Sequence, residues 1–340
     1  MHIVITGGAG FLGARLARTL LAGQQLSLAG SAAKRIESIT LVDRSAPPAD
    51  LAADKRITSL LGDLNQLLEP ATAASQPIWT QAALIFHLAA AVSGECEADF
   101  DLGLRSNVDA TRALLQACRT AATRPTVVFA SSLAVFGNSA EQPLPSVIDD
   151  RTLPTPQNSY GIQKFIGEQL VADYGRKGFI RARNVRLMTV SVRPGKPNGA
   201  ASSFLSGMIR EPLAGLRAAC PVSPDTAVAL ASPARTIEGL ICAAQARDEA
   251  WGARTAINLP ALTTTVGAMA QALEKLGGKA AVDLIDWTPD PVVANIVTSW
   301  PSVIDAARAR GLGLLPDPDF ESIVADYIRE NPQPQATGLA

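Results

Sequence analysis

The sequence predicts an α/β protein, with a doubly wound parallel sheet and a smaller C-terminal lobe. Two observations carry this prediction. The first half of the 340-residue chain alternates short, β-branched apolar runs with amphipathic stretches. Such runs are typical of parallel strands buried on both faces, and the amphipathic stretches of helices that cover them. A glycine-rich segment, TGGAGFLG at 6–13, joins the first run to the first amphipathic stretch. Alternating strands and helices form right-handed crossover units.

The first half contains five expected strands and two long expected helices. None of the strands alternates strictly between apolar and polar residues, so each is expected to lie inside the sheet. The strands are expected at 2–6, 39–42, 57–61, 83–87 and 126–130, and the helices at 11–22 and 106–121. The segment 23–37 is interpreted as a surface insertion.

The second half is less regular. Four prolines within 137–158 predict a long loop. Helices are then expected at 160–174, 202–217, 233–246, 302–310 and 319–330, and strands at 184–187 and 227–231. We therefore predict a dinucleotide-binding domain of the Rossmann type at 1–187, a lobe at 188–330 with some segments returning to the core, and a loose tail at 331–340.

Composition excludes several classes of protein. The net charge of −1, with 47% hydrophobic and 18% charged residues, is typical of a soluble globular chain. Nucleic-acid binding would require a basic excess, and no apolar run reaches the ~20 residues of a membrane span. Two histidines and four cysteines without metal-ligand spacing predict no metal site. Free thiols, together with an N-terminus that starts directly in a strand, predict a cytoplasmic protein.

The glycine-rich segment is the strongest local signal of a binding site. It follows a strand and opens a helix, which is the context that a dinucleotide-binding motif requires. Gly7 permits the tight turn, Gly10 lets the backbone approach a pyrophosphate, and Gly13 allows the helix to pack closely on the strand. The amides of the helix N-terminus, around Phe11 and Leu12, favour the bound phosphates.

Asp43 ends the next strand of the sheet. A carboxylate there accepts hydrogen bonds from the adenine ribose and repels a 2′-phosphate, so NAD is expected rather than NADP. Arg44 would weaken this preference, and Asp43 lies 30 residues after Gly13, further than the usual ~20. The alternative is an ordinary glycine turn with a capping aspartate.

Two further strand ends are expected to border the cofactor. Asp63, followed by Leu64, comes after the third strand and either binds the adenine amino group or caps a helix, and the sequence leaves both possibilities open. The small residues after the fourth strand let a cofactor lie against the backbone, and the segment is Leu88, Ala89 and Ala90. His87 is interpreted as a packed strand-end residue.

Tyr160 and Lys164 form a YxxxK pair, and residues four apart share one helix face. A phenol with a pKa of ~10 is a poor base at neutral pH. A nearby ammonium and a positive nicotinamide ring stabilise the phenolate, so Tyr160 is predicted to take the proton from a substrate hydroxyl.

Ser131 and Ser132 end the fifth strand, where a hydroxyl can hold the reacting oxygen. The alternative is a tight strand exit built of small residues. Asn107 is predicted either to order a water molecule beside Lys164 or to cap the start of a helix.

These residues together resemble the extended short-chain dehydrogenases/reductases, the NAD-dependent epimerase/dehydratase family. The matching pieces are TGGAGFLG at 6–13, Asp43, GDL at 62–64, HLAA at 87–90, Asn107, SSLAVFG at 131–137 and SYGIQK at 159–164. The resemblance implies that the catalytic residues are Ser132, Tyr160, Lys164 and Asn107. Ser132 is chosen over Ser131 because the family serine lies four residues before the aromatic residue, here Phe136. The resemblance also implies that Tyr160, Lys164, Leu187 and Thr189 contact the cofactor.

Within this family the chain is similar to the D-erythronate dehydrogenases. The segments that show this similarity are HLAAAVSGE at 87–95, PTPQNSYGIQK at 154–164 and the long segment 185–215, in which Met188 replaces an expected proline. The likeness implies oxidation of the C2 hydroxyl of D-erythronate to 2-dehydro-D-erythronate with NAD. The alternatives are a uronate dehydrogenase and a sugar-nucleotide epimerase. A nucleotide sensor without catalysis would lack Tyr160 or Lys164, and a dehydratase would carry a carboxylate beside Ser132.

An acid substrate needs a guanidinium or a cluster of donors for its carboxylate. The candidate cations are Arg193, Lys196, Arg210 and Arg235, and the sequence does not rank them. The predicted substrate contacts are Ser93, Ser132, Tyr160, Thr189, Arg193 and Arg210, with Ser202 and Ser203 as further hydroxyls nearby.

The resemblance also implies a homodimer. Family members commonly pair through the helix that carries the YxxxK pair. The apolar positions Ile162, Phe165, Ile166 and Leu170 allow such a contact. No nucleic-acid or membrane partner is expected.

Overall fold

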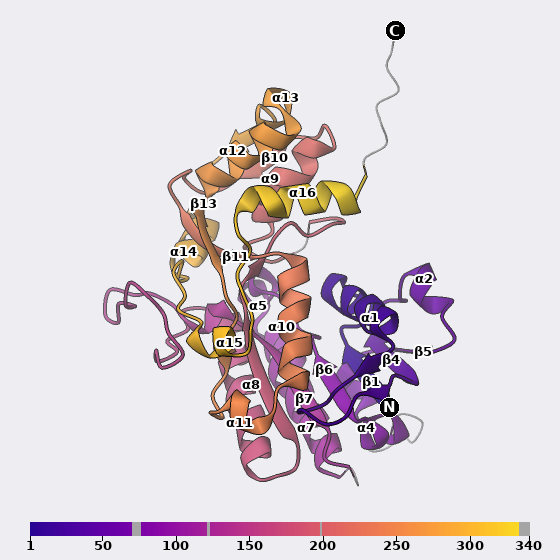
Figure 1. Ribbon diagram of the computed structural model, residues 1–340. Coiled ribbons are helices and arrows are strands. Elements are labelled where there is room, and N and C mark those ends of the chain that lie inside the picture. Colours follow the sequence, from indigo (N-terminus) through magenta and orange to yellow (C-terminus); the bar gives the residue numbers. More distant parts are fainter. Residues whose placement is uncertain (70–75, 121–122, 198, 333–340) are drawn as a thin grey trace.

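The computed structural model describes residues 1–69, 76–120, 123–197 and 199–332 (Figure 1). A seven-stranded sheet in the order β12-β8-β7-β6-β1-β4-β5 forms the centre of the larger domain, and all its neighbouring strands are parallel. The strand order reverses beside β1, so the carboxyl ends of β1 and β6 border a crevice. The predicted doubly wound fold is confirmed.

The strands of this sheet lie close to their predicted positions. They are β1 (His2–Thr6), β4 (Ser38–Asp43), β5 (Ile57–Leu61), β6 (Leu84–His87), β7 (Thr126–Ser132), β8 (Arg181–Leu187) and β12 (Ile257–Asn258). The last of these had not been predicted. It returns from the C-terminal half of the chain to pair with β8.

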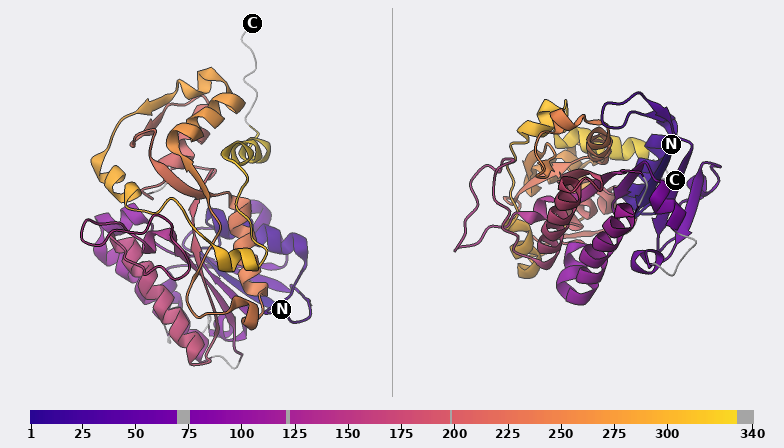
Figure 2. Two further views of the ribbon diagram at one scale, coloured as in Figure 1. Left: turned by 60° about the vertical axis from the view of Figure 1, so that its left-hand side comes forward. Right: turned by 90° about the horizontal axis from the view of Figure 1, so that it is seen from below.

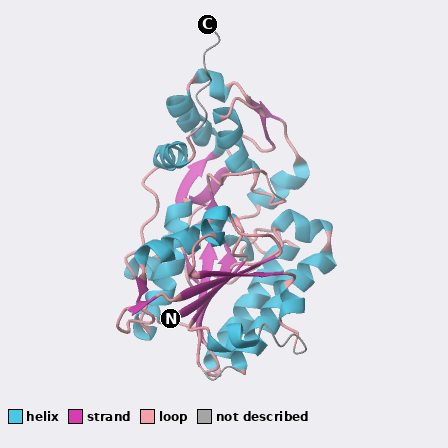
Figure 3. Ribbon diagram, turned by 90° about the vertical axis from the view of Figure 1, so that its right-hand side faces the viewer, coloured by secondary structure: helices cyan, strands magenta, loops and turns pink. Residues whose placement is uncertain are grey.

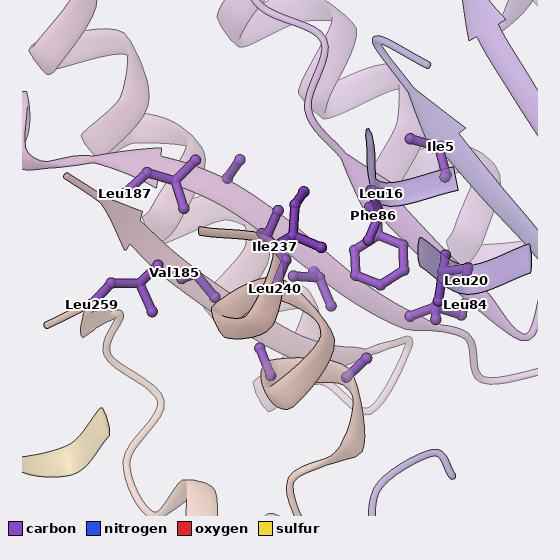
Figure 4. Packing of buried hydrophobic residues seen from close by; sticks show 14 of the residues in the cluster. Ile5, Leu16, Leu20, Leu84, Phe86, Val185, Leu187, Ile237, Leu240 and Leu259 are labelled. Atoms are coloured by element: carbon purple, nitrogen blue, oxygen red, sulfur yellow. The ribbon is translucent and has the colours of Figure 1, made fainter. Parts of the chain in front are cut away.

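Both faces of the sheet are covered by apolar clusters. Successive strand residues point to opposite sides, so one strand contributes to both clusters. Ile3 and Ile5 belong to one apolar cluster with residues of helices α1 (Phe11–Gly23) and α10 (Pro233–Gln245). Figure 4 shows Ile5 in this cluster. Val4 packs in another cluster with α4 (Gln76–Gln81), α7 (Ala110–Arg119) and α8 (Ser159–Arg176). Figure 3 shows helices on both sides of the strands.

Short helices complete this domain around the sheet. They are α2 (Ala49–Ala52), α3 (Leu64–Leu67), α5 (Ser93–Ala98), α6 (Phe100–Gly103), the π-helix η1 (Leu104–Asp109), the 3-10 turn η2 (Leu133–Val135), α11 (Asp248–Trp251) and α15 (Ala307–Gly311). The segment interpreted as a surface insertion contains the hairpin β2 (Gln25–Leu26) and β3 (Lys34–Arg35), and buries Leu26 and Ile36.

The second lobe has its own apolar core and stands above the carboxyl ends of the strands (Figures 1 and 2). Its sheets are β13-β11-β9 and β10-β14. The elements are β9 (Thr189–Val190), α9 (Phe204–Leu213), β10 (Ala218–Cys220), β11 (Ala227–Ala231), β13 (Leu262–Thr265), α12 (Val266–Gly277), α13 (Lys279–Val282), β14 (Ile285–Trp287), α14 (Pro291–Thr298) and α16 (Phe320–Glu330).

Three predicted helices differ from those observed. The helix expected at 302–310 covers only α15, because residues before it run beside the long loop, where Ile148 pairs with Ile304. The helix expected at 202–217 is limited to α9, which ends near Pro212 and the left-handed Gly215. The helix expected at 106–121 begins inside η1. Most of the predicted tail, 333–340, lies outside the described residues. No helix in the described part of the chain is long and apolar enough to cross a membrane.

Candidate active site

A cavity of about 410 Å³ runs along the carboxyl ends of the strands, between the two lobes. Most of the predicted site residues meet in its wall, although they come from many separate segments. They are Gly7, Gly10, Phe11, Leu12, Gly13, Asp43, Asp63, Leu64, Leu88, Ala89, Ala90, Ser93, Ser132, Tyr160, Lys164, Leu187, Thr189 and Arg193. Asn107 and Arg210 are not part of this wall.

The glycine loop is shaped to receive a phosphate group. Gly7 has a left-handed φ of +70°, and a Cβ at Gly13 would lie 2.1 Å from the carbonyl oxygen of Gly7. Larger residues would therefore open the loop. Helix α1 starts after Gly10 with no side chain capping its first turn, so its amides remain available to an anion.

Two carboxylates, those of Asp43 and Asp63, line the same cavity as Tyr160. Asp43 accepts hydrogen bonds from the amide of Ala9 in the glycine loop (3.0 Å) and from that of Ser45 (3.1 Å). Asp63 caps α3 by accepting from the amide of Asn65 (2.9 Å), so the capping alternative holds, and the residue also borders the cavity. Arg44 lies in the same wall.

His87 is a packed strand-end residue, as predicted. It is 1% exposed, and its ring nitrogens contact the hydroxyls of Thr6 (2.7 Å) and Thr111 (3.0 Å). Burial, together with the charge of Lys164, lowers the pKa of His87 to about 3. The imidazole is therefore neutral in the folded protein across the physiological range.

This buried histidine predicts an acid-sensitive stability. Between pH 6.5 and about 3 the unfolded chain binds a proton at this position and the folded chain does not. Stability should therefore fall with decreasing pH in that window, by up to about 1.4 kcal/mol per pH unit from this group. Urea unfolding at several pH values should show a shallower fall for His87→Gln than for the wild type. Parallel curves for the two proteins would contradict the prediction.

The catalytic candidates gather where β7 ends and α8 begins. Asn158 caps α8 by accepting from the amide of Gly161 (2.8 Å), which places Tyr160 in the first helical turn. Ser132 ends β7 and hydrogen-bonds Tyr160. Lys164 donates to the carbonyl oxygen of Ala130 (2.9 Å), and its ammonium lies 5.7 Å from the ring centre of Tyr160.

Burial controls the ionisation of both groups in the absence of a cofactor. It raises the pKa of Tyr160 to about 12, although the hydrogen bond with Ser132 acts in the opposite direction. Burial also lowers the pKa of Lys164 to about 8. The predicted depression of the tyrosine pKa is thus not observed, because burial outweighs the hydrogen bond with Ser132 and the charge of Arg193.

Asn107 lies behind the cavity wall and does not cap a helix start, because it sits inside η1. Its amide nitrogen donates to Gln163 Oε1 (2.8 Å), and its amide oxygen accepts from the amide of Ala91 (2.8 Å). Its carbonyl oxygen accepts from Thr111 (2.6 Å). The side chain therefore ties η1 to α8 and to the exit of β6.

A buried ion pair connects helix α8 to strand β8. Glu168, one turn after Lys164, accepts two hydrogen bonds of 2.8 Å from Arg186 on β8, and both side chains are almost inaccessible. Ser131 donates to the same carboxylate (2.5 Å). The pair thus joins α8, β7 and β8 directly beneath Ser132.

Arg193 reaches the cavity wall, whereas Arg210 does not. Arg210 is 7% exposed, pairs with Glu211 and donates to the carbonyl oxygen of Arg193 (2.7 Å). Arg210 therefore lies outside the cavity wall, and its role as a substrate contact stays a prediction. Ser202 borders the cavity, but Lys196, Ser203 and Arg235 do not.

Several cavity residues had no signal in the sequence. Trp300 lines the wall and packs against the cores of both lobes. It reaches this place because the amide of Asn138 donates to the carbonyl oxygen of Ser299 (2.8 Å). Ser106 and Val190 also line the cavity. When backbone hydrogen bonds between distant residues set the position of a loop, the local sequence has no pattern that predicts it.

Comparisons with known proteins agree with this geometry. The chain is 46% identical to a D-erythronate dehydrogenase from Cupriavidus necator, over 97% of this chain and 98% of that protein. It is 41% identical to a D-erythronate dehydrogenase from Haemophilus influenzae, over 96% and 99% of the two chains. A solved structure titled as a nucleoside-diphosphate-sugar epimerase from Agrobacterium tumefaciens superposes with a TM-score of 0.86 at 39% identity, covering 97% and 94%.

Residues 3–226 match the NAD dependent epimerase/dehydratase family. This match contains the glycine loop, Asp43, Asp63, and the pair Tyr160 and Lys164. The chain therefore belongs to the NAD dependent epimerase/dehydratase family.

Proposed function

We propose that this protein is a dehydrogenase that oxidises the C2 hydroxyl of D-erythronate to 2-dehydro-D-erythronate with NAD. The observation that carries the proposal is the identity of 41% and 46% to two D-erythronate dehydrogenases over nearly the full length. The juxtaposition of Ser132, Tyr160 and Lys164 in one cavity supports it, since a hydroxyl oxidation needs a base beside the reacting oxygen.

The residues that line the cavity are of the types that a dinucleotide requires. The uncapped start of α1 would hold the pyrophosphate, Asp43 the adenine ribose, and Tyr160 with Lys164 the nicotinamide ribose. The residues of β8 and β9 that border the cavity, Leu187 and Thr189, would contact the nicotinamide. When bound, NAD supplies the hydride acceptor and a positive ring charge close to Tyr160.

The side chains divide the proton chemistry among them. Ser132 holds the substrate oxygen through its hydroxyl, and Tyr160 takes the proton from that oxygen. Lys164 favours the phenolate through its charge, since it lies beside the ring. Asn107 contributes by holding η1 and α8 in register, through Gln163.

Asp43 should select NAD over NADP. The Asp43→Asn variant keeps an oxygen for the amide of Ala9 and removes the charge that repels a 2′-phosphate. With Arg44 in the same wall, the ratio of kcat/KM with NAD to that with NADP should fall at least about tenfold, equivalent to about 1.4 kcal/mol. Steady-state kinetics with both cofactors measures this ratio. An unchanged ratio would remove Asp43 as the selector.

The activity itself is tested by nicotinamide absorbance. Purified protein is mixed with NAD and D-erythronate, with galacturonate and NADP as the two controls. Formation of NADH with D-erythronate and not with galacturonate is expected. NADH formed only with galacturonate would favour a uronate dehydrogenase instead.

A sugar-nucleotide epimerase is the second candidate, because the Agrobacterium structure at 39% identity bears that title. Such an enzyme keeps its cofactor between turnovers. Cofactor that stays bound on gel filtration, with no NADH formed from any free acid, would replace the dehydrogenase proposal with this one.

We further propose a homodimer that pairs through α8. Ile162 and Ile166 on this helix are 46% and 37% exposed, and Phe100 on α6, a helix that contacts α8, is 60% exposed. Burying such side chains is favourable, at about 25 cal/mol per Å². The double variant Ile162→Glu, Ile166→Glu should be monomeric by light scattering after gel filtration. Val292→Glu, exposed on the second lobe, is the control, and a dimer that survives the double variant would contradict the proposal.

We also propose that the protein works in the cytoplasm. All four cysteines are free, and Cys96, Cys118 and Cys220 are buried. Burial raises the pKa values of these thiols. Inert, unpaired thiols are typical of a reducing compartment.

A further inference from the structure

The guanidinium of Arg193 has no counter-ion within the part of the chain that the structure describes. Its side chain borders the cavity, and one nitrogen donates to the hydroxyl of Ser202 (3.3 Å). Burial and the charge of Arg210 both act against this cation and lower its pKa, yet an arginine remains charged in proteins. A partly buried charge without a partner is costly, so the cavity is electrostatically incomplete at this point.

The fold holds the backbone of Arg193 from both sides. Its amide donates to the hydroxyl of Ser206 (3.0 Å), and its carbonyl oxygen accepts from Arg210 (2.7 Å). Both partners stand on α9, and Arg210 is itself held by Glu211. The second lobe thus fixes where Arg193 enters the cavity.

The other candidate cations are already accounted for. Arg210 is paired with Glu211 behind the wall, and Arg235 is paired with Glu238 on the surface. Lys196 is exposed and does not border the cavity. Of the four cations that the sequence left unranked, Arg193 alone reaches the cavity.

We propose that Arg193 binds the carboxylate of the substrate, and that Ser206 and Arg210 are positioning residues that hold it there. The inference rests on the proposed function, since it names the anchor for an acid substrate of that same site. A carboxylate would complete the charge balance through two parallel hydrogen bonds with the guanidinium.

This placement also accounts for which carbon is oxidised. Arg193 and Tyr160 line the same cavity, and the charge of Arg193 acts on the pKa of Tyr160 in the direction opposite to burial. In a 2-hydroxy acid the carboxyl carbon is bonded to C2. A carboxylate held by Arg193 would therefore keep the C2 hydroxyl next to the anchor, in the cavity that Tyr160 also lines.

The test is calorimetric binding of D-erythronate to the protein in the presence of NADH, which prevents turnover. Arg193→Met should weaken binding at least about 100-fold, the usual loss when one partner of a buried charge pair is removed. Arg193→Lys should recover part of this loss, since it restores the charge without the two-pronged geometry. Arg235→Gln is the matched control and should bind like the wild type. NADH affinity and thermal unfolding of each variant confirm that the fold is intact.

Two further measurements are needed. One distinguishes the positioning role of Arg210 from direct substrate binding, and the other tests the role of Arg193 separately from the proposed reaction. Arg210→Met should raise KM more than it lowers kcat, because it loosens Arg193 without removing it. Binding of D-erythronate that depends on Arg193, without turnover by the wild type, would overturn the proposed function and leave the anchor standing. Binding by Arg193→Met within about threefold of the wild type would overturn the anchor, as would equal loss in Arg193→Met and Arg193→Lys. If the wild type binds neither D-erythronate nor D-glycerate nor L-threonate, the anchor is overturned as well.

Discussion

The Tyr160→Phe variant is expected to retain NAD binding, since the other cofactor contacts remain, and to lose about 10²- to 10⁴-fold in kcat. The phenyl ring fills the same space in the first turn of α8, so the cavity keeps its shape. The group that accepts the proton is removed, while Ser132 and Lys164 remain. Steady-state turnover and cofactor titration by fluorescence measure the two quantities separately.

Tyr174→Phe provides the matched control for this experiment. Tyr174 lies on the same helix, but its hydroxyl donates to Gln116 (3.2 Å) and it is not part of the cavity wall. Turnover of this variant should equal that of the wild type. Turnover by Tyr160→Phe close to the wild-type rate would remove Tyr160 as the base.

The largest loss of stability is expected from Glu168→Ala. This change leaves the guanidinium of Arg186, 4% exposed, without its counter-ion, and it removes the acceptor of Ser131. Breaking one side of a buried ion pair costs about 3–5 kcal/mol in the free energy of unfolding. Urea unfolding measures this change.

Glu238→Ala is the control on the surface. Its pair with Arg235 is largely exposed, and such pairs contribute about 1 kcal/mol or less. The double variant Glu168→Met, Arg186→Met should recover part of the stability that Glu168→Ala loses, since neither charge is then left buried alone. A loss below about 1 kcal/mol for Glu168→Ala would contradict the assignment of this pair as a support of the catalytic helix.

The elements that carry a local pattern were predictable from the sequence. Four of the five β-branched runs mark strands that are buried on both faces, whereas the run at 57–61 forms β5, a partly exposed strand at the edge of the sheet. The glycine loop needs residues that no other type can replace at Gly7 and Gly13. Tyr160 and Lys164 were predictable as a pair, since helical spacing alone puts them on one face.

The parts that depend on distant contacts were not predictable. Arg193 and Arg210 look equivalent in the sequence. Only the tertiary structure shows that Arg210 pairs with Glu211, whereas Arg193 has no counter-ion among the described residues. Trp300 enters the cavity because Ser299 pairs with Asn138, more than a hundred residues away in the chain. The raised pKa of Tyr160 likewise follows from burial, which spacing does not reveal.

The most direct test of the account follows the hydrogen on C2. D-Erythronate deuterated at C2 is incubated with the protein and NAD, and the reduced cofactor is analysed by mass spectrometry. We predict that the reduced cofactor carries the deuterium and that 2-dehydro-D-erythronate forms in equal amount. Reduced cofactor without deuterium, or deuterium retained in the product, would show that another carbon is oxidised and would contradict the proposed reaction.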